Sequence, residues 1–208
     1  MNPKNPTNAT APMLYLLRHG ATIRGPKKRY IGQTDIALSD LGRRQAHWWQ
    51  KELSAINFDA IYCSDLSRAS DTAQIVAAAR TTDIQATSQL REINLGDWDG
   101  VDMPEIREKY PDAWLQRGQQ VDCFRPPEGE SFQDLQDRVL PVVESVDFDR
   151  VKNVLMVSHA GVNRVILCRV LKKPLKDLFL ISQGAAALNQ IVFQDGQFDI
   201  VSINRLPE

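Results

Sequence analysis

The sequence has few cysteines and no long apolar run, and each shortage excludes a class of protein. The three cysteines, Cys63, Cys123 and Cys168, are odd in number and widely spaced. They match neither a disulfide framework nor a metal-ligand pattern. No apolar run approaches the length that spans a bilayer, and residues 1–12 lack the hydrophobic segment of a secretory signal. We therefore expect a cytoplasmic protein whose residues 1–12 form a disordered polar tail.

The sequence also has little net charge and no nucleotide-binding glycine motif. Its 25 Lys and Arg nearly balance its 26 Asp and Glu, which leaves a formal net charge of −1. No global field therefore recruits nucleic acid or an anionic membrane, and any anion site must be local. The pattern G-x-x-x-x-G-K-[ST], which cradles nucleotide phosphates, is absent. We expect neither nucleic acid nor a membrane as a partner, and the choice between a monomer and a homodimer stays open.

Buried strands alternate with amphipathic helices along the chain. Short unbroken apolar runs at 13–17, 58–63 and 154–157 are typical of strands covered on both faces. This alternation predicts an α/β fold, a three-layer α/β/α sandwich in which helices flank a mostly parallel central sheet. Because the sequence has no internal repeat and no linker, residues 13–208 are expected to form a single domain. The segment at about 96–130 is the least periodic, and we interpret it as an insertion over the sheet edge and a candidate lid.

Capping and turn residues delimit several of the predicted elements. Ser39 can cap a helix, and Ser131 with Asp134 resembles a capping box at the start of another. The apolar stripe predicted for the first of these helices consists of Leu41, Ala46, Trp49 and Leu53. A further helix is predicted to begin near Ser67. Near the C-terminus, Asp195-Gly196 predicts a hairpin between two strands.

Three of the predicted strands end in residues that suit an anion. The first runs into Arg18-His19-Gly20, the second into residues 64–68, which end in Arg68, and the third into residues 158–161. Ligands in open α/β sheets bind at the carboxyl ends of the strands, so these residues can converge on one pocket. Two histidines, each directly after a buried strand, favour a functional role over a purely structural one.

Two arginines and two histidines suit a tetrahedral phosphate dianion. Guanidinium groups such as those of Arg18 and Arg68 bind phosphate oxygens in bidentate fashion and stay charged. The helix that begins near Gly161 can add backbone N–H donors, including that of Ala160, and a favourable dipole. The hydroxyl of Thr22 is a further candidate donor, with a simple capping role equally open. Phosphoryl transfer needs positioning and charge stabilisation above all, so we expect no metal and no other cofactor.

These residues lie in six blocks that resemble, in order along nearly the whole chain, those of the histidine phosphatase superfamily, the phosphoglycerate-mutase-like proteins. The first block carries the pattern R-H-G-x-[ST]. The six blocks are residues 17–22, 30–39, 64–73, 90–100, 127–131 and 157–161. A single tripeptide occurs often by chance, whereas six ordered blocks are strong evidence. One departure is Gly25, which stands where many members carry an asparagine that contacts phosphate.

The resemblance implies a role for each residue of the predicted pocket. His19 is the expected nucleophile and forms a transient phosphohistidine, while Arg18, Arg68 and His159 hold the phosphoryl group. Glu92 is the expected general acid for the leaving oxygen and then the base that activates water. An imidazole attacks phosphorus only when it is unprotonated, so we expect a backbone carbonyl to bind the other ring nitrogen of the nucleophile.

The activity implied by the resemblance is metal-independent hydrolysis of a small phosphorylated metabolite. Residues 93–98 lack the arginine and tyrosine of the phosphoglycerate mutases, and the chain is shorter than those enzymes, which favours hydrolysis. The short insertion and the loop 127–131 resemble the alpha-ribazole phosphatases of cobalamin biosynthesis, and broad-specificity sugar-phosphate phosphatases are nearly as similar. Two alternatives stay open: a phosphoglycerate mutase dependent on 2,3-bisphosphoglycerate, and an inactive module that binds a phosphorylated ligand.

A lone histidine and a group of three aspartates are further candidates for a functional site, but neither lies in a pattern typical of one. His47 lies mid-helix outside every block, and we expect it to be structural or exposed to solvent. Asp97, Asp99 and Asp102 suggest a metal, but their spacing lacks the rest of a calcium loop.

Overall fold

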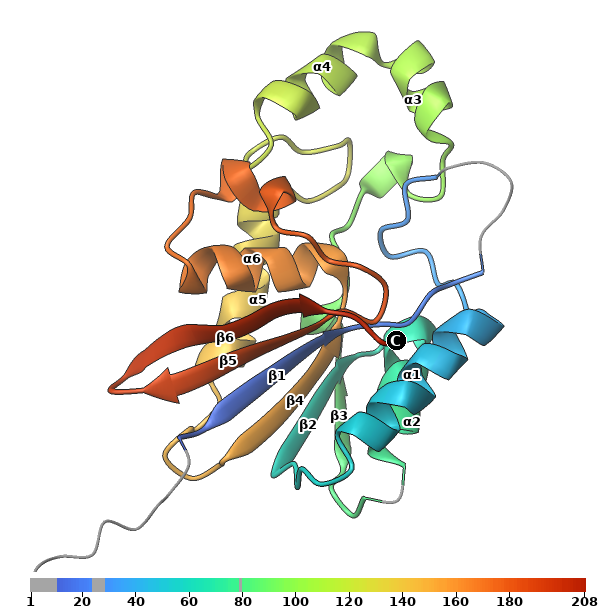
Figure 1. Ribbon diagram of the computed structural model, residues 1–208. Coiled ribbons are helices and arrows are strands. Elements are labelled where there is room, and N and C mark those ends of the chain that lie inside the picture. Colours follow the sequence, from blue (N-terminus) through green and yellow to red (C-terminus); the bar gives the residue numbers. More distant parts are fainter. Residues whose placement is uncertain (1–10, 24–28, 79) are drawn as a thin grey trace, which may run out of the picture.

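A computed structural model describes residues 11–23, 29–78 and 80–208, in which one six-stranded sheet forms the central layer (Figure 1). The strand order is β3-β2-β4-β1-β5-β6. Strands β1 to β4 are mutually parallel, β5 is antiparallel to β1, and β6 is antiparallel to β5. The strands are β1 Met13–Arg18, β2 Ala60–Ser64, β3 Ile84–Thr87, β4 Asn153–Ser158, β5 Leu188–Gln194 and β6 Gln197–Arg205. The predicted α/β fold with a mostly parallel sheet is confirmed.

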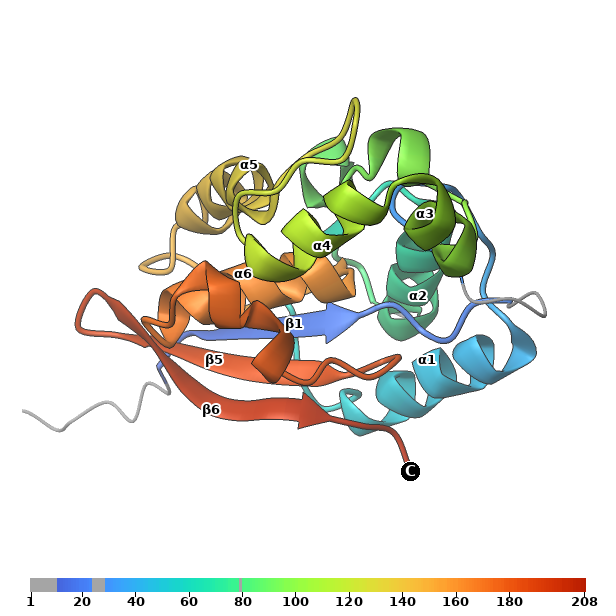
Figure 2. The ribbon, with the colours of Figure 1, turned by 90° about the horizontal axis from the view of Figure 1, so that it is seen from above.

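Helices cover both faces of this sheet (Figures 1 and 2). Helices α1 (Asp40–Glu52) and α2 (Ser67–Ala77) pack on one face, and α5 (Phe132–Glu144) and α6 (Ala160–Val170) pack on the other. Both predicted N-caps are present. The Ser39 side chain accepts a hydrogen bond from a backbone N–H of α1, and Ser131 forms a full capping box with Asp134 at the start of α5.

The apolar run of β1 is unbroken because its side chains alternate between two cores. Leu14 and Leu16 pack with residues of α5 and α6, whereas Tyr15 and Leu17 pack with residues of α1 and α2. Each of the four is buried, and full burial of a large apolar side chain contributes about 1.5–3 kcal/mol. A strand buried on both faces is thus held rigidly, and so is the position of the residues that follow it.

The predicted stripe of α1 is wrong at one residue. Leu41 is 49% exposed, whereas Ala46, Trp49 and Leu53 are buried. Gly42 is buried in its place. Spacings of four, three and four residues from 42 to 46, 49 and 53 put Gly42 on the same helix face as the other three buried residues. A Cβ at Gly42 would collide with the backbone of Ala21, so the helix packs directly against the segment that follows β1.

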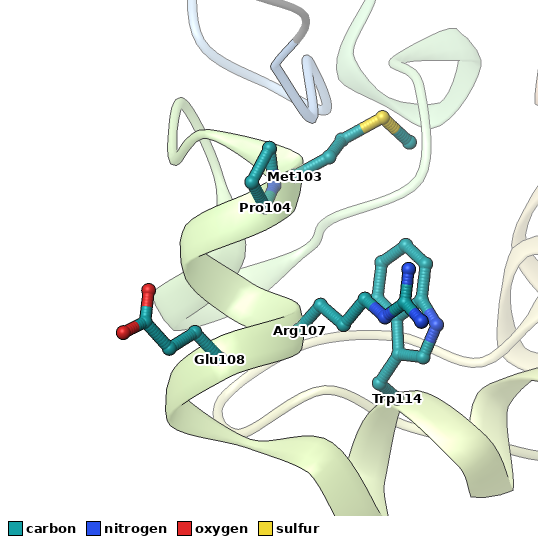
Figure 3. A pocket seen from close by; sticks show the side chains of 5 residues that line it. All are labelled: Met103, Pro104, Arg107, Glu108 and Trp114. Carbon is teal, nitrogen blue, oxygen red and sulfur yellow. The ribbon is translucent and has the colours of Figure 1, made fainter.

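The insertion at 96–130 contains more regular structure than its sequence pattern indicates. It holds the short helix η2 (Gly96–Trp98) and two helices, α3 (Met103–Lys109) and α4 (Pro111–Gln119). Both helices begin with proline in the first turn, where the ring costs no hydrogen bond. Figure 1 shows the pair standing apart from the sheet, beyond α6. An open hollow of about 500 Å³ on this pair is lined by Met103, Pro104, Arg107, Glu108 and Trp114 (Figure 3).

Three further outcomes concern single segments. Strand β3 was not predicted, because its four residues alternate poorly and none is fully buried. Residues 1–10 of the predicted tail, and Gly25, lie outside the described residues. Across the described ranges, no helix is long and apolar enough to cross a membrane.

Two glycine substitutions test the packing of α1. We expect Gly42→Ala to lower the free energy of unfolding by ~1–3 kcal/mol, because the added methyl group meets fixed backbone. Gly118→Ala is the matched control in α4, where a Cβ would meet nothing within 4 Å, and it is expected to raise stability by ~0.4–1 kcal/mol. Urea denaturation of both variants measures the difference; equal effects would contradict the close contact with Ala21.

Candidate active site

The register of β1 and β4 brings the two strand-end histidines together. Arg18 pairs with Ser158 at the ends of these neighbouring parallel strands. His19 and His159 are the next residues, and the His19 amide donates a hydrogen bond to the Ser158 carbonyl at 2.9 Å. The two imidazole rings lie with their centroids 5.1 Å apart. Convergence at the carboxyl ends of the strands, expected from the sequence, is confirmed for this pair.

The His19 ring is fixed in one tautomer by its own turn. Its Nδ1 lies 2.7 Å from the Gly20 carbonyl oxygen, and because a carbonyl only accepts, Nδ1 must carry the proton. Burial holds the pKa of His19 well below its usual value, and Arg18 and Arg68 lower it further, while the Gly20 hydrogen bond opposes the shift. The imidazole is therefore neutral, with its lone pair on Nε2, as the sequence argument for a carbonyl partner predicted.

His19 and His159 form a cluster with Arg18, Arg68 and Glu92. Within this cluster, the His159 ring is an unsatisfied group. The residue is fully buried as the N-cap of α6, and neither ring nitrogen has a hydrogen-bond partner among the described residues. Burial, followed by the nearby His19 and Arg68, lowers the pKa of His159 well below its usual range. A buried polar group without a partner costs about 1–3 kcal/mol. A ligand oxygen would supply the missing partner.

Arg68 is held in place by backbone carbonyls of the loop after residue 31. Its Nη1 donates to the Thr34 carbonyl at 2.9 Å and its Nη2 to the Gly32 carbonyl at 2.7 Å. The Asp99 carboxylate in turn accepts hydrogen bonds from the amides of this loop and from the Thr34 hydroxyl. Asp99, suggestive of a metal ligand by composition alone, thus fixes the loop that orients a buried guanidinium.

Arg18 is oriented by a buried polar network that the sequence analysis did not identify. Its Nη1 donates to the Gln183 carbonyl at 2.7 Å. The Gln183 side chain is bonded to Asn163 of α6 and Asn189 of β5, and Asn189 donates to the Leu16 carbonyl, two residues before Arg18. Because these buried amides satisfy one another, the network defines one arrangement of the strand end. The signal available in the sequence was the presence of Asn163 in the mostly apolar α6 and of Asn189 in β5.

Glu92 faces the beginning of α6. Its Oε2 accepts from the Gly161 amide at 3.1 Å, and its Oε1 accepts from the Ile93 amide at 3.0 Å. The approach requires glycine, because a Cβ at residue 161 would collide with the Glu92 carboxylate. Arg138 of α5 supports the backbone here through a hydrogen bond to the Glu92 carbonyl. The carboxylate therefore lies beside the helix that His159 caps.

The two remaining predicted ligands, Ala160 and Thr22, follow the two histidines along the chain. Ala160 is the first residue of α6, a helix whose N-cap side chain makes no capping bond. Thr22 forms an isolated backbone bridge with Leu38, and its hydroxyl role stays a prediction. No group of three or more His, Cys, Asp or Glu within the described part of the chain could hold a metal ion.

An α/β sheet with two neutral histidines at adjacent strand ends, the half-buried Arg18 beside them and the buried Arg68 supplied by α2 define an enzyme that handles phosphoryl groups. The chain belongs to the histidine phosphatase superfamily, branch 1, whose family model matches residues 14–206. It is a phosphatase of that superfamily.

Three relatives illustrate the similarity. The adenosylcobalamin/alpha-ribazole phosphatase of Escherichia coli K12 is 32% identical over 178 residues, which cover 82% of this chain and 86% of that protein. Phosphoserine phosphatase 1 of Hydrogenobacter thermophilus is 30% identical over 195 residues, or 92% and 91% of the two chains. The crystal structure of a candidate alpha-ribazole-5'-P phosphatase from Escherichia coli K-12 superposes with a TM-score of 0.87 at 25% identity, over 94% of this chain and 97% of that one. The substrates in the names of these relatives differ, so the comparisons show the phosphatase class and not one leaving group.

The contact between Gly161 and Glu92 can be tested by Gly161→Ala. We expect kcat/KM for an alkyl phosphate to fall ~10²–10⁴-fold, the range of a displaced general acid or base. Steady-state kinetics of Gly161→Ala, Glu92→Gln and the double variant form the test. If the carboxylate is the group displaced, Glu92→Gln costs little in the Gly161→Ala background; additive losses would show that the glycine acts elsewhere.

Proposed function

We propose that this phosphatase hydrolyses small phosphomonoesters without a metal, through a phosphohistidine at His19. The observation that carries the proposal is the His19 imidazole itself. It is buried and neutral, with Nδ1 engaged by the Gly20 carbonyl, and the unpartnered ring of His159 lies beside it. Such an imidazole can use only Nε2 as a nucleophile.

In the first step, Nε2 of His19 attacks phosphorus and the ester P–O bond breaks. Arg18, Arg68 and His159 bind the nonbridging oxygens, whose negative charge is stabilised best by donors already fixed in place. Carbonyl contacts fix both guanidinium groups before substrate arrives. Glu92, as the acid, gives its proton to the departing alkoxide, which leaves as an alcohol.

In the second step, water displaces the imidazole. Glu92, now a carboxylate, takes a proton from the water as its oxygen bonds to phosphorus, and the P–N bond breaks. The bonding electrons return to Nε2, so His19 is again neutral, and inorganic phosphate departs. Each cycle consumes one ester and one water and needs no other reactant.

Similarity to named relatives supports two candidate substrates. Alpha-ribazole 5'-phosphate is one candidate, because the Escherichia coli relative is named for that activity. O-phosphoserine is another, on the same ground. We place the protein in the cytoplasm, where small phosphorylated metabolites of either kind are found.

The activity is tested by hydrolysis of 4-nitrophenyl phosphate in excess EDTA. We expect wild type to turn over and His19→Ala to lose at least ~10³-fold in kcat, because the covalent intermediate cannot form. His47→Ala is the matched control, since His47 is exposed on α1 and bonds only the neighbouring Gln50 among the described residues.

Three results would overturn the proposal. Loss of activity in EDTA would indicate a metal, and full activity of His19→Ala would indicate another nucleophile. Absence of hydrolysis by wild type, with turnover of 3-phosphoglycerate that depends on 2,3-bisphosphoglycerate, would establish a mutase.

A further inference from the structure

Two arginines from different elements share one aromatic ring beside the catalytic cluster. The ring belongs to Phe179 in the short helix η3 (Leu175–Leu180), and it is partly exposed. The guanidinium carbon of Arg164, on α6, lies 5.4 Å from the ring centroid, and that of Arg117, on α4, lies 5.8 Å from it. Figure 1 shows the η3 segment between α4 and α6. The insertion thus brings a second cation to the ring.

Neither arginine forms an ion pair with a described residue, although the charge of Glu92 acts on Arg164 through space. The one hydrogen bond that Arg164 makes there is from Nε to the Ile181 carbonyl, at 2.9 Å. Arg117 stacks on the Tyr30 ring at 5.0 Å and makes neither a salt bridge nor a hydrogen bond with a described residue. Two like charges against one ring repel each other, and a shared anion would remove that repulsion. Stacking leaves the N–H edges of a guanidinium available to such an anion.

Arg164 lies on the Glu92 side of the cluster, and Arg117 approaches the same region through the shared Phe179 ring. Arg164 is three residues beyond Gly161, whose amide binds the Glu92 carboxylate. Burial lowers the pKa of Arg164, and the charge of the nearby Glu92 opposes that shift. Glu92 is the group proposed to protonate the leaving oxygen. The alcohol part of a bound ester would therefore extend towards Arg164 and Arg117.

Tyr30 adds a second unsatisfied group to this region. Its hydroxyl is buried and has no hydrogen-bond partner among the described residues. Its ring packs against Trp98 and Trp114, with centroids 6.0 and 6.1 Å away, and carries Arg117 on top. These three aromatic rings hold Arg117 in place, so less side-chain entropy is lost when the guanidinium group binds an anion.

We propose that Arg117 and Arg164 form a subsite for an anionic substituent, a carboxylate or a second phosphate, on the leaving group of the substrate. This inference rests on the proposed phosphatase function, which places the leaving group beside Glu92. The preferred substrates are then phosphorylated acids or bisphosphates. An uncharged leaving group, such as the nucleoside of alpha-ribazole phosphate, would leave both arginines without an ion-pair partner.

Matched ester pairs test the subsite. Glycerol 3-phosphate is 3-phosphoglycerate with the carboxylate replaced by a hydroxymethyl group, and fructose 6-phosphate is the 1,6-bisphosphate without its second phosphate. We expect wild type to favour the anionic member of at least one pair in kcat/KM. Arg117→Gln and Arg164→Gln should each reduce that preference ~10–100-fold, the loss of a charged hydrogen bond, and Arg117→Lys should retain part of it. The pair that responds distinguishes carboxylate from phosphate.

Arg107→Gln is the matched control. Arg107 belongs to the same insertion, but it lines the hollow of Figure 3 rather than the Phe179 ring, so the preference should stay unchanged. Equal losses on both members of a pair would mean that Arg117 merely holds the insertion in place, and would overturn the subsite. Absence of a preference in both pairs would overturn it as well.

Calorimetric binding of the same four esters to His19→Ala separates this inference from the proposed function. If the anionic esters bind more tightly and Arg117→Gln removes the difference, the subsite stands even where hydrolysis has failed. If no anionic ester binds more tightly than its partner, the subsite is refuted while the phosphatase activity is judged from 4-nitrophenyl phosphate alone.

Discussion

The hydrogen bond between Nδ1 of His19 and the Gly20 carbonyl is the constraint on which the chemistry depends. It sets the tautomer, and so it determines which nitrogen can attack phosphorus. The carbonyl is itself held, because the Gly20 amide donates to Thr72 of α2 at 3.1 Å and its α-carbon packs against the backbone of Gly42 in α1. Two helices of one face thus position a single carbonyl oxygen at the end of a buried strand.

Burial gives the rest of the cluster its properties. It keeps both imidazoles neutral beside two guanidinium groups, and it leaves the ring nitrogens of His159 without a described partner. Charges and dipoles fixed in a dry pocket stabilise developing negative charge more effectively than mobile water does. The carbonyl contacts of Arg68 and the amide network behind Arg18 hold those charges before substrate binds.

The sequence predicts the centre of this structure better than its periphery. Unbroken apolar runs indicated the parallel strands, and the residues after each run include the histidines and arginines that the structure brings together. The buried face of α1 was partly mispredicted. Gly42 is buried by contact with Ala21, a residue outside the helix, and helical spacing does not reveal such a contact. Residues such as Gln183 and Arg117 could not be found by spacing, since their partners Arg18 and Tyr30 lie far away in the sequence. Residue roles, including that of Glu92, stay predictions.

The most direct test of the account is to find where the phosphoryl group resides on the enzyme. Wild type mixed with substrate and quenched rapidly in alkali, which preserves phosphohistidine, can be digested and analysed by mass spectrometry and ³¹P NMR. The account predicts a phosphoryl group on His19 at Nε2, the nitrogen that the Gly20 carbonyl leaves free. A phosphoryl group on Nδ1, or on another residue, would contradict it.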